Sequence, residues 1–222
     1  GMSKGVQFLM KKNKIEVIQG YGTIKPGKKV SVKSDDGKET EYSANNIIVA
    51  TGARSRVLPS LPQDGKKIIG YREAMSLDKQ PKKMLVVGSG AIGIEFAYFY
   101  NAMGTEVTVV EFLPNVVPVE DEEISKQLER SLKKAGIKIM TSAEVTKVDT
   151  SGPGVKATVK TTKGEEILEA DIVLSAVGIK TNIENIGGRL LPDQYSRILC
   201  HWRCNTRTGL GSCCFGRRHT LC

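Results

Sequence analysis

The chain has 222 residues, of which 40% are hydrophobic and 26% charged, as in ordinary globular proteins. The net charge of +9 does not indicate nucleic-acid binding, because the basic residues form no patch with interleaved aromatic side chains. No apolar run reaches the roughly 18 residues of a membrane span, and no hydrophobic leader follows Gly1. These features predict a cytoplasmic protein with neither nucleic acid nor membrane as a partner.

The first third of the chain has the pattern of strands and turns. We expect β-structure over residues 14–49, including a hairpin in which the turn Ser34–Gly37 joins 29–33 to 39–42. A short buried strand over 46–50 follows. Residues 53–70 contain two prolines and two glycines, so we expect a loop and linker there.

A strand–helix–strand unit comes next. The apolar run Met84–Val87 predicts a strand covered on both faces, and a glycine-rich turn follows it. A helix then presents one apolar face and ends at Gly104; the face comprises Ile92, Phe96, Phe99, Tyr100 and Met103.

The pattern continues with further alternation of strands and helices. We expect strands at 107–110 and 137–140, a helix capped by Asp121 between them, an antiparallel meander over 143–170 and a buried strand at 171–176.

The turn after Val87 contains the motif that indicates a binding function. Its sequence is Gly88-Ser89-Gly90-Ala91-Ile92-Gly93, a GxGxxG motif between a predicted strand and a predicted helix. In such a turn the first glycine permits the tight bend, the second lets the backbone approach a pyrophosphate, and the third lets the helix pack closely on the strand. The phosphates would lie at the helix N-terminus, where free N–H groups favour negative charge.

Two acids extend this prediction. Glu111 ends the next strand, where its carboxylate would accept hydrogen bonds from the adenosine ribose and repel a 2′-phosphate, favouring NAD over NADP. Glu95 lies in the first turn of the helix. It is either an acid favoured there by the helix dipole or a contact to the nicotinamide end of the cofactor.

The segment 86–95, VVGSGAIGIE, is similar to the NAD motif of the pyridine nucleotide–disulfide oxidoreductases. Residues 172–187 and 6–13 resemble the lipoamide dehydrogenase branch in particular, so the resemblance covers about 2–187. It implies an α/β fold: a Rossmann-like FAD/NAD(P)-binding domain of three layers (β/β/α) plus a partial FAD domain. It also implies that Gly178 closes the NAD site, that Glu95 lies beside the nicotinamide ribose, and that Ala50, Thr51 and Gly52 lie near FAD.

The resemblance also implies an oxidoreductase that passes electrons from dihydrolipoamide to a disulfide, then to FAD and NAD. Its homodimer would serve a 2-oxo acid dehydrogenase or glycine cleavage complex. Yet no flavin GxGxxG and no redox-active CxxxxC stand in the chain, so we expect an internal fragment that is inactive alone and has no catalytic residues. Another NADH-dependent flavoprotein disulfide reductase, or a stand-alone nucleotide-binding module without catalysis, remains an alternative.

The composition changes abruptly in the last part of the chain. All five cysteines lie in the last 23 residues, and no lysine follows Gly188. If residues 199–204 are encoded TTA TGC CAT TGG CGA TGT, a reading frame shifted by one base encodes Tyr-Ala-Ile-Gly-Asp. This string resembles a flavin-binding motif of the same family. We therefore interpret 188–222 as a frameshifted, disordered tail.

The rival interpretation of the tail is a metal site. Cys200, Cys204 and His201 could supply ligands, but Cys213 and Cys214 are adjacent and do not form the separated pair typical of zinc sites. We therefore expect no metal. The predicted domains are a partial FAD-binding domain at 1–75, an NAD-binding domain at 76–187 and the tail at 188–222.

Overall fold

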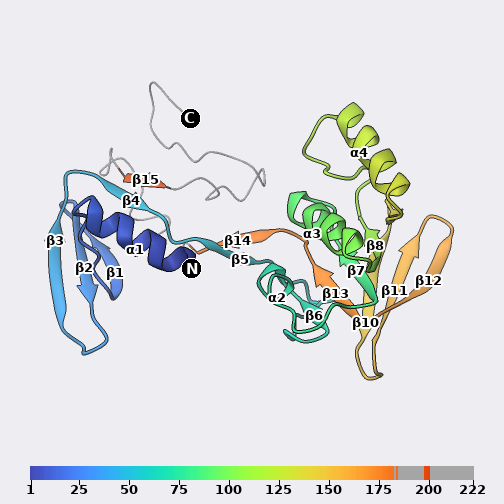
Figure 1. Ribbon diagram of the computed structural model, residues 1–222, viewed down its shortest axis with the longest axis horizontal. Helices are drawn as coiled ribbons and strands as arrows, with labels where there is room; N and C mark the ends of the chain where they lie inside the picture. Colours follow the sequence, from blue (N-terminus) through green and yellow to red (C-terminus); the bar gives the residue numbers. More distant parts are fainter. Residues whose placement is uncertain (183, 185–197, 201–222) are drawn as a thin grey trace. The chain divides into compact units, whose positions relative to one another are not determined.

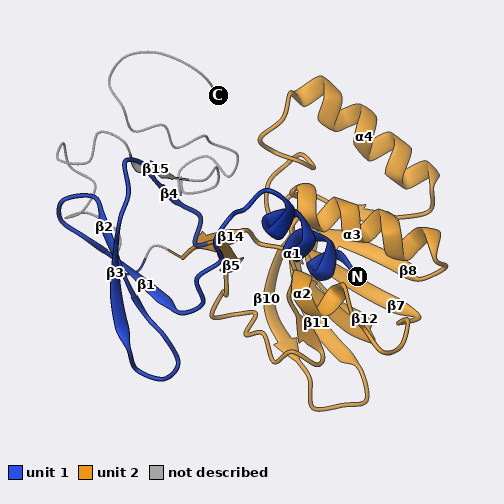
Figure 2. Ribbon diagram, turned by 60° about the vertical axis from the view of Figure 1, so that its left-hand side comes forward, with its two compact units in different colours: residues 1–51, 183–204, 212–222 blue, residues 52–182, 205–211 orange. Residues whose placement is uncertain are grey.

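A computed structural model describes residues 1–182, 184 and 198–200 (Figure 1). The chain divides into two compact units, coloured separately in Figure 2. Among the described residues, unit 1 comprises 1–51, 184 and 198–200, and unit 2 comprises 52–182. The domain division expected at 75/76 remains a prediction. The segment 52–75, expected in the first domain, lies in unit 2.

Unit 2 is built on a five-stranded parallel sheet with the order β6-β13-β7-β8-β9. The strands comprise β6 (Ile68–Ile69), β7 (Lys83–Val87), β8 (Glu106–Val110), β9 (Lys138–Met140) and β13 (Ile172–Ser175). The central strand β7 pairs with β8 and β13, and Val86 lies between Val109 and Leu174. The predicted strands of the unit are confirmed, apart from differences of one or two residues at their ends.

Three helices belong to this unit: α2 (Tyr71–Ala74), α3 (Ala91–Ala102) and α4 (Glu122–Lys134). The Asp121 side chain accepts hydrogen bonds from the Glu123 and Ile124 N–H groups, which confirms the predicted cap of α4. Gly104 has the positive φ of +94° that suits the residue after a helix.

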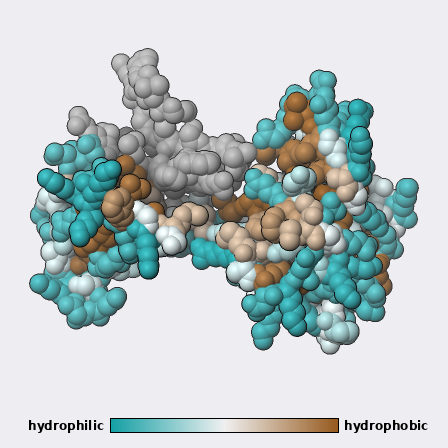
Figure 3. Space-filling model, in the orientation of Figure 1, coloured by the Kyte–Doolittle hydropathy of each residue, from teal (hydrophilic) through white to brown (hydrophobic). Residues whose placement is uncertain are grey.

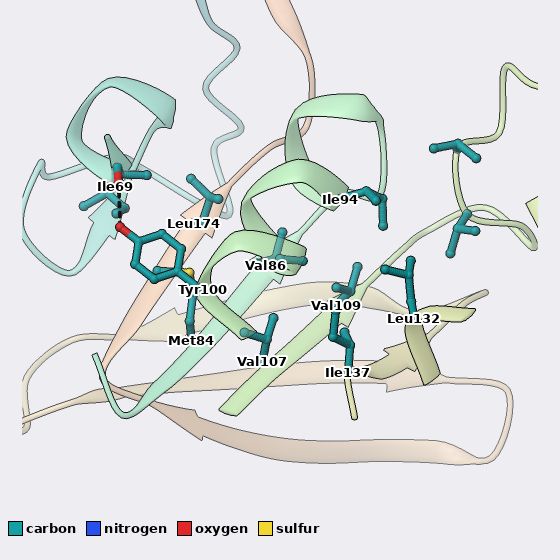
Figure 4. Close-up of a cluster of buried hydrophobic side chains, with 14 residues drawn as sticks. Ile69, Met84, Val86, Ile94, Tyr100, Val107, Val109, Leu132, Ile137 and Leu174 are labelled. Atoms are coloured by element: carbon teal, nitrogen blue, oxygen red, sulfur yellow. Dashed lines mark hydrogen bonds between the residues drawn. The ribbon is translucent and has the colours of Figure 1, made fainter. Parts of the chain in front are cut away.

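The two faces of the parallel sheet pack against different layers. Met84 and Val86 of β7 contact the helices, in a cluster with Ile94 and Leu132, whereas Leu85 and Val87 face the opposite side. This alternation follows from the period of two in a strand. Figure 4 shows the helical cluster, in which the buried Tyr100 hydroxyl donates to the Ala74 carbonyl oxygen at 2.6 Å.

The opposite face carries a second, antiparallel sheet with the order β10-β11-β12: β10 (Glu144–Asp149), β11 (Val155–Thr161) and β12 (Gly164–Ala170). Its Val145, Val155, Ala157 and Val159 are buried in one cluster with Leu85. The meander predicted over 143–170 is thus confirmed. Helices, parallel sheet and antiparallel sheet make the expected three-layer α/β fold.

Two expectations for unit 2 were wrong. The region 53–70 is not only loop, because it contains β6 and β5 (Ala53–Ser55), which pairs antiparallel with β14 (Ile179–Thr181). The buried face of α3 also differs from the predicted one. It is formed by Gly93, Ile94, Ala97 and Tyr100, whereas Phe99 and Met103 are 54% and 58% exposed.

Unit 1 begins with α1 (Met2–Lys12), which the sequence pattern did not predict. A three-stranded antiparallel sheet follows: β1 (Tyr21–Lys25), β2 (Lys29–Lys33) and β3 (Glu39–Ser43). The predicted hairpin between β2 and β3 is confirmed, but residues 14–20 are not a strand. The next strand, β4 (Ile47–Val49), is only partly buried, since Ile48 is 67% exposed.

The strand β15 (Ile198–Cys200) pairs in parallel with β4. These three residues therefore correct the expectation that the whole of 188–222 lacks regular structure. The remainder of that expectation, and the exclusion of a metal at Cys204, Cys213 and Cys214, fall outside the described residues.

On the face visible in Figure 3, hydrophilic side chains predominate, and apolar patches interrupt them in both units. Within the described part of the chain, no helix has the length and the apolar character needed to cross a bilayer.

Candidate functional site

The glycine-rich turn lies at the carboxyl end of β7. Gly88 has φ +99°, and a Cβ on it would lie 2.5 Å from the Ala176 carbonyl oxygen. A Cβ on Gly93 would collide with the Gly88 carbonyl oxygen, because α3 returns close to the strand. Both positions therefore require glycine for the backbone to fold in this way.

Gly90 differs from these two glycines. It is the residue before α3, has φ −66°, and a Cβ built on it would meet no protein atom within 4 Å. The space beside its α-carbon is thus open, and Gly90 lines a pocket. The N–H groups of the first helical turn have no acceptor within the helix, and no side chain caps α3. This is the arrangement that binds a phosphate group.

Glu111 directly follows β8, and its carboxylate faces the turn. One oxygen, Oε2, accepts from the Ser89 N–H at 2.7 Å and from the Ser89 hydroxyl at 2.8 Å. The other, Oε1, accepts from the Leu113 N–H at 2.8 Å. Glu111 is only 7% exposed, and these three donors compensate for its burial. A carboxylate has about four acceptor positions, so one remains for a ligand hydroxyl.

A cavity of about 600 Å³ opens beside these groups within unit 2. Of the predicted site residues, Gly88, Gly90, Glu111 and Gly178 line it together. Gly178 follows β13, the neighbour of β7 on the side away from β8. The other lining residues were not predicted: Arg56, Leu58, Ser60, Leu61, Val87, Val110, Phe112, Leu113, Pro118, Val119, Ala143, Glu144, Val145, Ala176 and Val177.

The other residues predicted for the turn do not line this cavity. Ser89 is fully buried and is engaged with Glu111, Gly93 is buried against the turn, Ala91 is exposed, and Ile92 is half-buried. Glu95 is exposed on α3 and lines a different, mainly apolar pocket with Phe96 and Phe99. The structure thus does not bring Glu95 to the cavity beside Gly90 and Glu111, and its cofactor contact remains a prediction.

The residues expected near FAD are exposed. Ala50 and Thr51 follow β4 in unit 1, and Gly52 begins unit 2 with φ +75°, its carbonyl accepting from the Asn182 N–H at 3.0 Å. Only Thr51 of the three has a polar side chain, and no second GxGxxG turn stands in the chain. These residues alone are too few to hold a flavin.

Part of the missed lining could have been predicted. Phe112 and Leu113 directly follow the acid at the end of β8, and both are exposed apolar residues, 67% and 43% accessible. An apolar pair immediately after an acid that is predicted to bind a ribose is a usable signal for an apolar wall of the same pocket. Arg56 gave no such signal, because pairing between segments far apart in the sequence brings it to the pocket.

Comparisons with known proteins agree with this geometry. The sequence pattern of the family described as pyridine nucleotide-disulphide oxidoreductase matches residues 1–207. The chain is 47% identical to the dihydrolipoyl dehydrogenase of Rhizobium etli over 84% of this chain and 42% of that protein. It is 40% identical to the mitochondrial dihydrolipoyl dehydrogenase of Pisum sativum over 92% of this chain and 42% of that protein.

The fold is also similar to that of a solved structure. LpdA from Mycobacterium tuberculosis superimposes with a TM-score of 0.75 and 28% identity, covering 93% of this chain and 50% of that one. The chain spans about two fifths of the length of the curated relatives it matches. Since the family pattern covers nearly all of the chain, the protein belongs to the pyridine nucleotide-disulphide oxidoreductase family.

Proposed function

We propose that unit 2 binds NAD as part of a dihydrolipoyl dehydrogenase, the flavoprotein that oxidises dihydrolipoamide with NAD as acceptor. The observation that carries the proposal is the buried Glu111 carboxylate held beside the open space at Gly90 in one cavity. When bound, NAD would supply the acceptor for a hydride. The chain's own residues would hold and orient it.

The pocket offers a complementary environment to each part of an adenine dinucleotide. The α3 N-terminus and Gly90 would receive the pyrophosphate, and Oε1 of Glu111 would accept a hydrogen bond from the adenosine ribose. Leu113 and Val119 would provide an apolar wall for the adenine. The charge of Glu111 would repel a 2′-phosphate, which favours NAD over NADP.

The 222-residue chain should bind NAD without turning over dihydrolipoamide. A disulfide oxidoreductase needs a positioned nucleophilic thiol pair, and no cysteine precedes Cys200 here. The test is a turnover assay with dihydrolipoamide and NAD, together with an absorption spectrum of the purified protein. Turnover, or a flavin band at stoichiometric level, would contradict the proposal.

The parent protein would be a cytoplasmic homodimer within a 2-oxo acid dehydrogenase or glycine cleavage complex. In that protein, residues 1–75 would belong to the FAD-binding domain, 76–187 to the NAD-binding domain, and 188–222 would be read out of frame. Sequencing the coding DNA tests this proposal for the reading frame, because codons 199–204 should encode Tyr-Ala-Ile-Gly-Asp when read one base later.

A further inference from the structure

A basic side chain, Arg56, lies at the edge of the proposed nucleotide cavity. Arg56 is the only lysine or arginine among the described residues that line it. The residue is exposed, and within residues 1–182 no ion pair or side-chain hydrogen bond involves its guanidinium group. Arg56 thus places a positive charge at the cavity, and no carboxylate within residues 1–182 forms an ion pair with it.

The fold holds Arg56 in place through its backbone. The Arg56 N–H donates to the Gly178 carbonyl oxygen at 3.0 Å, which extends the pairing of β5 with β14 by one residue. Gly178 itself lines the cavity two residues after Ala176, whose carbonyl oxygen lies against Gly88. The arginine therefore lies next to the glycine-rich turn, although 32 residues of chain separate it from Gly88 in the sequence.

The order of the strands indicates which part of a ligand Arg56 would meet. Gly178 follows β13, the turn follows β7, and Glu111 follows β8, and these three strands are consecutive neighbours in the sheet. Arg56 therefore lies on the side of the turn away from Glu111. A 2′-phosphate on the adenosine ribose would lie on the Glu111 side, whereas a pyrophosphate at the turn lies between the two residues.

We infer that Arg56 is a ligand-binding residue that contacts the pyrophosphate of the dinucleotide. This inference rests on the proposed NAD binding and assigns a charge partner that the glycine-rich turn alone does not supply. The turn offers neutral N–H donors, and a guanidinium group adds a full positive charge and a planar set of donors suited to phosphate oxygens.

The experiment compares Arg56→Gln with Arg54→Gln. Arg54 is the matched control, since it lies two residues earlier, is exposed, donates to the Asn182 side chain and does not line the cavity. Binding of NAD, ADP and adenosine to the full chain is measured by calorimetry at two salt concentrations. Circular dichroism and thermal unfolding check that each variant folds.

Arg56→Gln should weaken NAD and ADP binding by about 10- to 100-fold, as expected for loss of one charged hydrogen-bonding group. Adenosine affinity should not change, and binding of the diphosphates should become less sensitive to salt. Arg56→Lys, which keeps the charge, should restore part of the affinity. Arg54→Gln should bind all three ligands as the wild-type chain does.

Other results would overturn the inference. Unchanged NAD affinity in Arg56→Gln, an equal loss in Arg54→Gln, or an equal loss of adenosine binding would each exclude a direct contact with the pyrophosphate. Failure of the wild-type chain to bind NAD would instead contradict the proposed function, so the two failures are distinguishable.

Discussion

The Ser89 hydroxyl and the Ser89 N–H donate to the same oxygen of Glu111, at 2.8 and 2.7 Å. This pair joins the turn after β7 to the residue after β8, so the two parts of the pocket that would hold phosphate and ribose are fixed to each other. Both residues are buried, which makes these hydrogen bonds stronger than they would be in water.

Glu111→Gln should reduce the preference for NAD over NADP. The substitution keeps the side-chain shape and one oxygen acceptor but removes the negative charge that would repel a 2′-phosphate. We expect NAD affinity to fall by about 1–3 kcal/mol, the range for a hydrogen bond to a charged group, while NADP affinity falls less or rises. Calorimetric titration with both nucleotides measures the change.

Glu144→Gln is the control for this effect. Glu144 lines the same cavity but is exposed, and it lies on β10 rather than at the end of β8. It should leave the ratio of NAD to NADP affinity unchanged. If Glu111→Gln left the ratio of NAD to NADP affinity unchanged, or if both variants changed it equally, Glu111 would not be the residue that distinguishes the two riboses.

Substitutions at two of the three glycines of the turn, Gly93 and Gly90, should affect stability and NAD binding differently. Gly93→Ala forces a Cβ into the Gly88 carbonyl oxygen, so unit 2 should lose about 1–3 kcal/mol, as for other overpacked sites. Each kcal/mol should lower the melting temperature by roughly 2 to 4 °C. Gly90→Ala meets no protein atom and should keep nearly the wild-type melting temperature, yet its methyl group would occupy the space proposed for the pyrophosphate.

Gly90→Ala should therefore lose NAD binding while remaining folded. Thermal unfolding followed by circular dichroism, together with calorimetry, measures both properties. Full NAD affinity in a folded Gly90→Ala would show that no ligand approaches the backbone there. Wild-type stability in Gly93→Ala would contradict the close approach of α3 to the turn.

Asp64 makes the loop before β6 sensitive to acid. Its Oδ1 accepts from the Lys66, Lys67 and Ile68 N–H groups at 2.8, 2.8 and 2.9 Å. Burial, the largest single influence, raises the pKa of Asp64, but these backbone donors together outweigh it and lower the pKa below the ordinary value of 3.8. The charged form is therefore more favourable in the folded state than in the unfolded one.

The stabilisation from this carboxylate should be complete above pH 3.8 and lost as the pH falls through the lower, folded-state pKa. Comparing the chain with Asp64→Asn should show a stability difference at pH 6 that shrinks toward pH 2. Asp78→Asn, at an exposed position in the same unit, is the control. A difference between Asp64→Asn and the wild-type chain that does not depend on pH would contradict the role of the charge.

The parts of the fold that could be predicted from the sequence are those with strong local patterns. The apolar run at Met84–Val87 and the glycines after it predicted the strand, the turn and the start of α3, because burial on both faces and tight backbone geometry each leave a local signature. Glu111 could be placed in the site for the same reason, since it directly follows the next apolar strand.

The remaining features depend on long-range contacts. The strand β5 has three residues and forms only because β14, more than 120 residues later, pairs with it; no local pattern indicates this. The face of α3 was assigned to its large apolar side chains, yet the close approach of helix and sheet buries the small Gly93 and Ala97 instead. Helix α1 lacks a side-chain cap at Gly1, so its start carries no sequence signal.

The most direct test of the account is a calorimetric titration of the wild-type 222-residue chain with NAD and, separately, with NADP. We expect one NAD bound per chain and an NADP affinity at least about tenfold lower, because the charge of Glu111 lies where the 2′-phosphate would be. No binding of NAD, or equal affinity for the two nucleotides, would contradict it.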